Sequence, residues 1–262
     1  MGTLLATEGR HVFETMGTVV TVVAPDAGLT DGLRDDVFAA FHRLDERFSL
    51  YRAESEASAV ASHRLLLRDA SAEYRAAYDL AAEWTGATEG AFTAHRPDGA
   101  IDLSGVVKAL GIRDAGTLLS EHASDWCLNA GGDVLVSGTE RPGKPWVVGI
   151  VDPDDRTRLV SQFTCSPEFP AVATSGVAER GEHIWRVGSD ATFVQVSVAA
   201  SDIITADVLA TAILAGGPAT LDRATRRWRI EVLAFAVDGT ARATPAFRAG
   251  AGKGPRLDGS AG

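Results

Sequence analysis

The separation of helix-like from strand-like patterns is the feature that most constrains the fold of this 262-residue chain. Apolar residues recur at three- and four-residue steps in segments 30–48 and 71–85, as on the buried face of an amphipathic helix. From Trp126 onward, alternating and β-branched segments separated by glycine turns dominate. Helices gathered in one half and strands in the other predict an α+β fold rather than repeating βαβ units.

Two other segments complete the expected order of elements. Phe13–Val23 is β-branched and alternates, which predicts one strand entered through the turn at Met16–Thr18. The polar stretch after Phe48 predicts a loop. The small residues that begin at Ser104 predict the start of another helix, whose free N–H groups would favour an anion.

No internal repeat and no linker divides the chain. We therefore expect a single domain over residues 13–240, an N-terminal extension over 1–12 and a largely disordered tail over 241–262. The last residues of that tail are rich in glycine, alanine and proline, a composition that buries little apolar surface.

Composition and charge exclude several classes of function. With 45% hydrophobic residues the chain can bury a large core. Its net charge of −10 and its lack of a basic stripe argue against nucleic-acid binding. The two cysteines, Cys127 and Cys165, have no metal-binding spacing and are expected in the core. Without a signal-peptide pattern or an apolar run of membrane-spanning length, a cytoplasmic protein is expected.

One acidic residue interrupts the apolar helical segment Ile204–Gly217. Asp207 and Thr211 are four residues apart and therefore stack on one helix face. A carboxylate beside a hydroxyl forms half of a site for Mg²⁺, which takes oxygen ligands and completes its shell with phosphates and water. The same pattern also fits a buried helix whose aspartate caps a neighbouring group and whose threonine bonds back to a carbonyl. Both interpretations stay open on this segment alone.

Short polar motifs recur along the chain in a fixed order. They are MGT at 16–18, SLY at 49–51, IDLSGVVK at 101–108, NAGGD at 129–133, ATSG at 173–176, HI at 183–184 and ADVLAT at 206–211. Together with PWVVGIVDP at 145–153, this order resembles the ApbE family of FAD:protein FMN transferases. No single motif is specific, but the ordered set spans nearly the whole expected domain.

The resemblance implies an α+β fold, related to the T-fold, with mixed or antiparallel sheets and a flavin cleft between two lobes. It implies an enzyme that cleaves the pyrophosphate of FAD and attaches FMN through a phosphoester to a threonine or serine of an acceptor protein, releasing AMP. Mg²⁺, or alternatively Mn²⁺, would neutralise charge on the bridging oxygens. A monomer or a homodimer is expected.

The resemblance also assigns the metal ligands and a catalytic base. Asp207 and Thr211 match the family's metal-binding A-D-x-x-A-T, and main-chain carbonyls near Gly105 and at Ala210 are further expected ligands. His183 matches the histidine that would take the proton of the accepting hydroxyl, since a histidine titrates near neutral pH. A surface histidine without a catalytic role is the alternative for His183.

The remaining site residues would surround FAD. Met16 and Tyr51 match the apolar and stacking wall around the flavin, and Asp133 matches a contact to the nucleotide half. The other residues that the resemblance assigns to FAD binding are Lys108, Thr174, Ser175 and Ile184.

The chain departs from the family pattern at three places. Segment 92–101 is short where the family has a longer stretch over the flavin, the residues after His183 lack an Asp-Pro turn, and Lys108 is followed by Ala109 instead of glycine. Two alternatives therefore stay open: a Mg²⁺-dependent FAD pyrophosphatase, in which water replaces the acceptor, and a non-catalytic FAD-binding or carrier protein.

Overall fold

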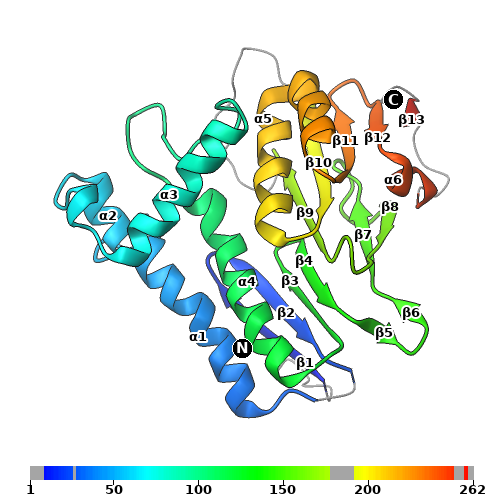
Figure 1. Ribbon diagram of the computed structural model, residues 1–262, viewed down its shortest axis with the longest axis horizontal. Helices are drawn as coiled ribbons and strands as arrows, with labels where there is room; N and C mark the ends of the chain where they lie inside the picture. Colours follow the sequence, from blue (N-terminus) through cyan, green and yellow to red (C-terminus); the bar gives the residue numbers. More distant parts are fainter. Residues whose placement is uncertain (1–8, 26–27, 178–191, 251–256, 259–262) are drawn as a thin grey trace. The chain divides into compact units, whose positions relative to one another are not determined.

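The computed structural model describes residues 9–25, 28–177, 192–250 and 257–258. The chain divides into two compact units. Figure 1 labels their helices and strands. Unit 1 comprises Met1–Ala82 and Ala94–Trp146, and unit 2 comprises Glu83–Thr93 and Val147–Gly262, in each case where they are described.

Unit 1 is built on antiparallel strands in the order β1-β2-β3-β4. Their bounds are β1 Arg10–Thr15, β2 Thr18–Val23, β3 Trp126–Ala130 and β4 Asp133–Ser137, followed by the short pair β5 Thr139–Arg141 and β6 Lys144–Pro145. The turn expected at Met16–Thr18 is confirmed, but the single strand expected over Phe13–Val23 is wrong, because a strand lies on each side of that turn. Met16 and Gly17 have φ of 50° and 69°, and two successive positive φ values are what a tight two-residue hairpin turn requires.

Two long helices, α1 (Asp31–Phe48) and α4 (Ser104–His122), lie side by side on this sheet (Figure 1). The Thr30 hydroxyl accepts a hydrogen bond from the Leu33 N–H at 3.2 Å and so caps α1. A Cβ at Gly111 of α4 would come within 2.8 Å of the Phe41 ring, so glycine permits the close approach of the two helices. The helix predicted at 30–48 is confirmed.

Three shorter elements complete the helical part of unit 1. They are α2 (Glu56–Ala61), η1 (Leu67–Asp69) and α3 (Ala72–Ala87), whose last residues belong to unit 2. The helix predicted at 71–85 is confirmed as α3, whereas α2 forms inside the stretch that was expected to be a loop. The Ser55 hydroxyl accepts from the Ser58 N–H at 2.9 Å, and this cap starts α2.

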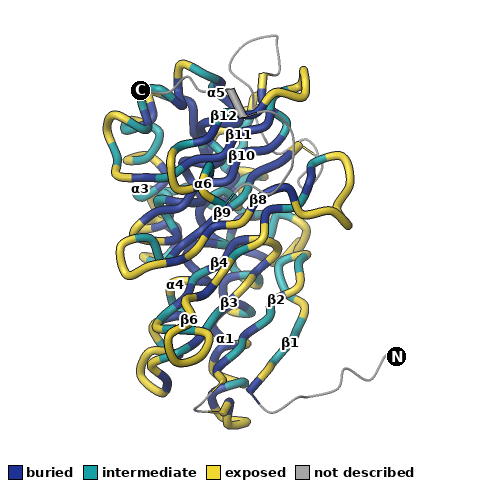
Figure 2. The backbone as a smooth tube through the Cα atoms, turned by 90° about the vertical axis from the view of Figure 1, so that its right-hand side faces the viewer, coloured by how far each residue is buried: buried dark blue, intermediate teal, exposed yellow. Residues whose placement is uncertain are grey.

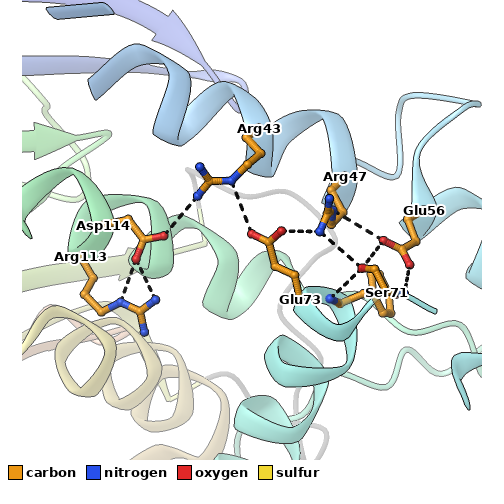
Figure 3. Close-up of polar contacts among 8 residues, drawn as sticks. Arg43, Arg47, Glu56, Ser71, Glu73, Arg113 and Asp114 are labelled. Carbon is orange, nitrogen blue, oxygen red and sulfur yellow. Dashed lines mark hydrogen bonds and ion pairs between the residues drawn. The ribbon is translucent and has the colours of Figure 1, made fainter. Parts of the chain in front are cut away.

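A polar network on the surface of unit 1 connects α1 to the beginnings of α2 and α3 (Figure 3). Arg43 lies 3.6 Å from Glu73, and Arg47 contacts both Glu73 and Glu56. The Ser71 hydroxyl donates to the Glu56 carboxylate at 2.7 Å. Because these side chains are partly exposed, each pair contributes about 0–1 kcal/mol. The network orients the short helices rather than providing most of their stability.

Unit 2 contains strands in the order β9-β10-β11-β12-β13, antiparallel except for the parallel pair β12–β13. Their bounds are β9 Ala171–Gly176, β10 Phe193–Ala200, β11 Glu231–Ala236, β12 Ala241–Ala243 and β13 Leu257–Asp258; β7 Val147–Val151 and β8 Leu159–Thr164 form a separate antiparallel pair. Strands β9 to β11 are mostly buried, as the dark blue tube in Figure 2 shows.

Helix α5 (Ile203–Arg227) packs on β9 and β10. The Asp202 carboxylate accepts from the Thr205 N–H at 2.9 Å and caps its start. Gly217, with φ 67° and ψ −157°, breaks the helix before Pro218, in a backbone region that is essentially restricted to glycine.

Among the described residues, α5 alone is long and apolar enough to cross a membrane, so the expectation that no segment reaches this length needs correction. However, 67% of its most apolar window is buried inside the protein, as in a core helix, which makes its length and composition a weak indication of a membrane span.

Both ends of the expected domain are placed differently by the structure. Strand β1 begins at Arg10, inside the predicted N-terminal extension. Strand β12 and helix α6 (Pro245–Ala249) lie inside the predicted tail, where Phe247 is fully buried with its ring 4.8 Å from that of Phe163. This aromatic contact packs α6 against β8.

Candidate functional site

The predicted site residues fall in both units. Unit 1 carries Met16, Tyr51, Gly105, Lys108 and Asp133, and unit 2 carries Thr174, Ser175, Asp207, Ala210 and Thr211. His183 and Ile184 lie outside the described residues, so their roles stay predictions.

A buried ion pair lies between α4 and β4 in unit 1. The Lys108 ammonium contacts the carboxylate of Asp133; the aspartate is fully buried and the lysine side chain is 15% exposed. The turn at Gly131–Gly132, with φ of 62° and 96°, delivers Asp133 to the start of β4. Because burying a charge costs several kcal/mol unless it is paired, each partner stabilises the other. The partner that remains accessible to a ligand is Lys108.

The N-terminus of α4 adds positive potential beside this lysine. The Asp102 carboxylate, 9% exposed, accepts from the Ser104 N–H at 2.9 Å. The other N–H groups at a helix start favour anions, and Lys108 follows within the second turn. Sequence reasoning assigned no role to Asp102, although an aspartate that accepts from the N–H two residues on forms a recognisable Asx turn.

A groove of about 600 Å³ opens beside the β1–β2 turn, entirely within unit 1. Met16 lines it together with Phe38, His42, Asp45 and Arg52. The Phe38 and His42 rings stack with centroids 5.3 Å apart and planes at 15°. Positions 38, 42 and 45 share one face of α1 by their helical spacing, a signal that sequence reasoning missed. Aromatic and thioether walls of this kind suit a flat ring system.

The loop after α1 holds Tyr51 in an exposed position. The tyrosine is 85% exposed, and its neighbour Arg52 lines the groove. Arg52 donates from Nε and Nη2 to Asp45 Oδ2 at 3.0 and 2.8 Å, while the Ser55 hydroxyl donates to the Ser49 carbonyl at 2.6 Å. These hydrogen bonds restrain the loop and therefore fix the backbone that carries the Tyr51 ring.

In unit 2, a buried acid and a pair of hydroxyls lie where α5 packs on β9. Asp207 is fully buried, and Thr211 is one helical turn further along the same face. The Ser175 Oγ is 3.0 Å from the Thr211 Oγ1. Because adjacent strand residues point to opposite faces, Thr174 lies on the other side of β9, where its hydroxyl is 2.8 Å from that of Ser197. The structure therefore brings together Ser175 and Thr211 but not Thr174.

The donors on α5 fit a hard divalent cation. Asp207 offers carboxylate oxygens and Thr211 a hydroxyl oxygen, the ligand types that Mg²⁺ and Mn²⁺ prefer. The described residues contain no group of three or more histidine, cysteine or acidic side chains arranged to hold a metal ion, so such an ion would take its other ligands from the backbone, phosphates or water. The carbonyls of Gly105 and Ala210 lie inside helices, where each accepts a backbone hydrogen bond, and their role as ligands stays a prediction.

Cys165 offers no nucleophile to these groups. Cys165 is buried, and burial raises the pKa of its thiol to about 12. Its thiol is therefore protonated at neutral pH and unsuited to nucleophilic attack.

We expect Cys165 to resist alkylation by iodoacetamide in the native protein at pH 8 and to react fully once the protein is unfolded in guanidinium chloride. Peptide mass spectrometry after timed labelling measures both rates. Labelling of Cys165 in the native protein at the unfolded-state rate would contradict its burial.

Comparisons with known proteins agree with this architecture. The family model described as ApbE family matches residues 93–234. The solved structure of the flavin transferase ApbE from Vibrio cholerae superimposes with a TM-score of 0.74 at 20% identity, covering 94% of this chain and 100% of that chain. The ApbE protein from Thermotoga maritima gives a TM-score of 0.74 at 18% identity, covering 94% and 100% of the two chains.

A third structure, the apo form of the Pseudomonas stutzeri flavinyl transferase ApbE, gives a TM-score of 0.74 at 19% identity, covering 97% of this chain and 100% of that chain. No curated protein matches the chain significantly. At these identities the structural likeness shows the fold, and the predicted α+β class with antiparallel sheets is confirmed.

Proposed function

Because the chain belongs to the ApbE family, as the match over residues 93–234 shows, we propose that it is an FAD:protein FMN transferase. The hydroxyl oxygen of an acceptor threonine or serine attacks the phosphorus of the FMN half of FAD. The bond between this phosphorus and the bridging oxygen breaks, AMP leaves with that oxygen, and the hydroxyl proton passes to a base. The observation that carries the proposal is the buried carboxylate of Asp207 beside the paired hydroxyls of Thr211 and Ser175.

Unit 1 offers surfaces for both ends of the flavin nucleotide. The groove at Met16, with its Phe38–His42 stack, accepts a flat ring, and the exposed Tyr51 ring provides a further stacking surface. The Lys108 ammonium, held by Asp133, together with the N-terminus of α4 favours the charged phosphates. Thus FAD is the substrate class that suits these features.

Unit 2 offers the donors for the metal ion. Asp207 and Thr211 would hold Mg²⁺, which when bound supplies charge neutralisation on the pyrophosphate and on the departing AMP. Asp207 is fully buried among the apolar residues of α5, whereas Thr211 is only half-buried. We assign proton removal from the acceptor hydroxyl to His183 on the family resemblance.

The test is incubation with FAD and MgCl₂, with and without an acceptor domain that carries a threonine or serine flavinylation segment. A transferase releases AMP only together with acceptor labelling, measured by chromatography of the nucleotides and in-gel flavin fluorescence. Free FMN and AMP without acceptor would show the pyrophosphatase alternative. Intact FAD under all conditions would leave only the carrier alternative.

A further inference from the structure

We propose that Ser175 is a positioning residue for the metal ligand Thr211, an inference that rests on the proposed function. The serine was expected to contact FAD, yet it is 1% exposed and has its hydroxyl 3.0 Å from that of Thr211. A side chain so deeply buried acts on its neighbour rather than on a ligand in solvent. Its role is to orient the threonine hydroxyl toward the cation that Asp207 also binds.

A hydroxyl has a single proton to donate, and this limit gives Ser175 its role. Threonine has one O–H and two lone pairs. When the oxygen of Thr211 binds a cation through a lone pair, its proton must be donated in another direction. Ser175 Oγ lies within hydrogen-bonding distance and accepts that proton, which fixes the rotation of the Thr211 side chain.

Without Ser175, the threonine hydroxyl has an alternative partner. A mid-helix threonine commonly donates to the carbonyl one turn earlier, and its side chain then occupies a different orientation. Ser175 favours the orientation that serves the metal, as outer-shell hydrogen bonds do at other metal sites. Strand β9 supplies it because the alternation of the strand directs residue 175, and not residue 174, toward α5.

The opposite face of the same strand provides a matched control. Ser197 of β10 is fully buried, and its hydroxyl is 2.8 Å from the hydroxyl of Thr174. The Ser197–Thr174 pair therefore has the chemistry and burial of the Ser175–Thr211 pair but lies away from Asp207. Ser197→Ala removes a buried serine hydroxyl without touching the proposed metal ligands.

The experiment measures Mn²⁺ binding to each purified protein by electron paramagnetic resonance in the presence of FAD, and the Mg²⁺ concentration that gives half-maximal AMP release. Ser175→Ala should weaken the affinity for both ions about tenfold or more, the usual cost of losing an outer-shell partner. At saturating Mg²⁺, kcat should recover to within about threefold of wild type, because the ligands themselves remain. Ser197→Ala should bind Mn²⁺ with wild-type affinity.

Two further variants test whether Ser175 affects Mn²⁺ binding through Thr211. Thr211→Ala with Ser175→Ala should bind Mn²⁺ no more weakly than Thr211→Ala alone, since Ser175 acts through Thr211. Ser175→Cys keeps a buried side chain of similar size with a poor acceptor and should reproduce the weakening if the alanine variant does not fold.

Three results would each overturn the proposal. The first is wild-type Mn²⁺ affinity in both Ser175 variants, and the second is an equal loss of Mn²⁺ affinity in Ser197→Ala. The third is a double variant whose loss of Mn²⁺ affinity equals the sum of the losses in the two single variants. The Mn²⁺ measurement does not require turnover. A wild-type protein that binds Mn²⁺ but labels no acceptor would therefore refute the proposed transferase and leave the role of Ser175 measurable.

Discussion

Replacing Asp207 with asparagine is expected to lower the Mg²⁺-dependent rate of AMP release from FAD by at least about 100-fold. A bound cation supplies several kcal/mol of charge stabilisation, and each ~1.4 kcal/mol changes the rate tenfold. Asparagine keeps the size of the buried side chain but removes the negative charge that attracts the ion. Chromatography of AMP over time, across a range of MgCl₂ concentrations, measures the effect.

The control for this variant lies on the same helix. Asp222 is in the part of α5 beyond the break at Gly217 and is half-buried, so Asp222→Asn makes the same chemical change away from Ser175 and Thr211. It should leave the rate within about twofold of wild type, because Asp222 is not one of the proposed metal ligands. An Asp207→Asn variant that retains the wild-type rate, with the wild-type thermal unfolding midpoint, would contradict the assignment of Asp207 as a metal ligand.

The second large effect concerns stability. Lys108→Met should destabilise the protein by about 3–5 kcal/mol, because it removes the cation that faces the buried Asp133 carboxylate. For a protein of this size the loss corresponds to a fall of roughly 6–20 °C in the thermal unfolding midpoint. Differential scanning calorimetry at pH 7 measures the change.

The double variant Lys108→Met with Asp133→Leu distinguishes the loss of the ion pair from the cost of leaving the Asp133 carboxylate buried without a cation. Replacing both charges by apolar groups removes the buried carboxylate as well, so most of the lost stability should return. FAD affinity, measured by flavin fluorescence, should stay below that of wild type, because Lys108 is the partner that a phosphate of FAD can reach and the double variant lacks it. A Lys108→Met variant as stable as wild type would show that the ion pair does not contribute to the fold.

Local patterns predicted the helices well because their signals are contained within short segments. The apolar spacing of Leu33, Val37, Phe41 and Leu44 and the cap at Thr30 were sufficient to place α1. The turn at Met16–Gly17 was predicted, whereas β1 before it was not predicted as a separate strand, because Arg10–Thr15 has fewer β-branched residues than Thr18–Val23.

The site was predictable only in part, for a different physical reason. The i, i+4 spacing of Asp207 and Thr211 follows from one helix, whereas the Lys108–Asp133 pair joins α4 to β4 across 25 residues of sequence and depends on tertiary packing. The opposite orientations of Thr174 and Ser175 follow from strand alternation, so the assignment of both to one cleft conflicted with a pattern already present in the sequence. The groove residues Phe38 and His42 were overlooked because they lie just outside the apolar face of α1.

The most direct test of the transferase account is the intact mass of an acceptor domain after incubation with this protein, FAD and MgCl₂. The account predicts a mass increase equal to one FMN phosphoester on a threonine or serine, with one AMP released per modified acceptor and no labelling by Asp207→Asn. An acceptor of unchanged mass, in a reaction where an established flavin transferase labels the same domain, would contradict it.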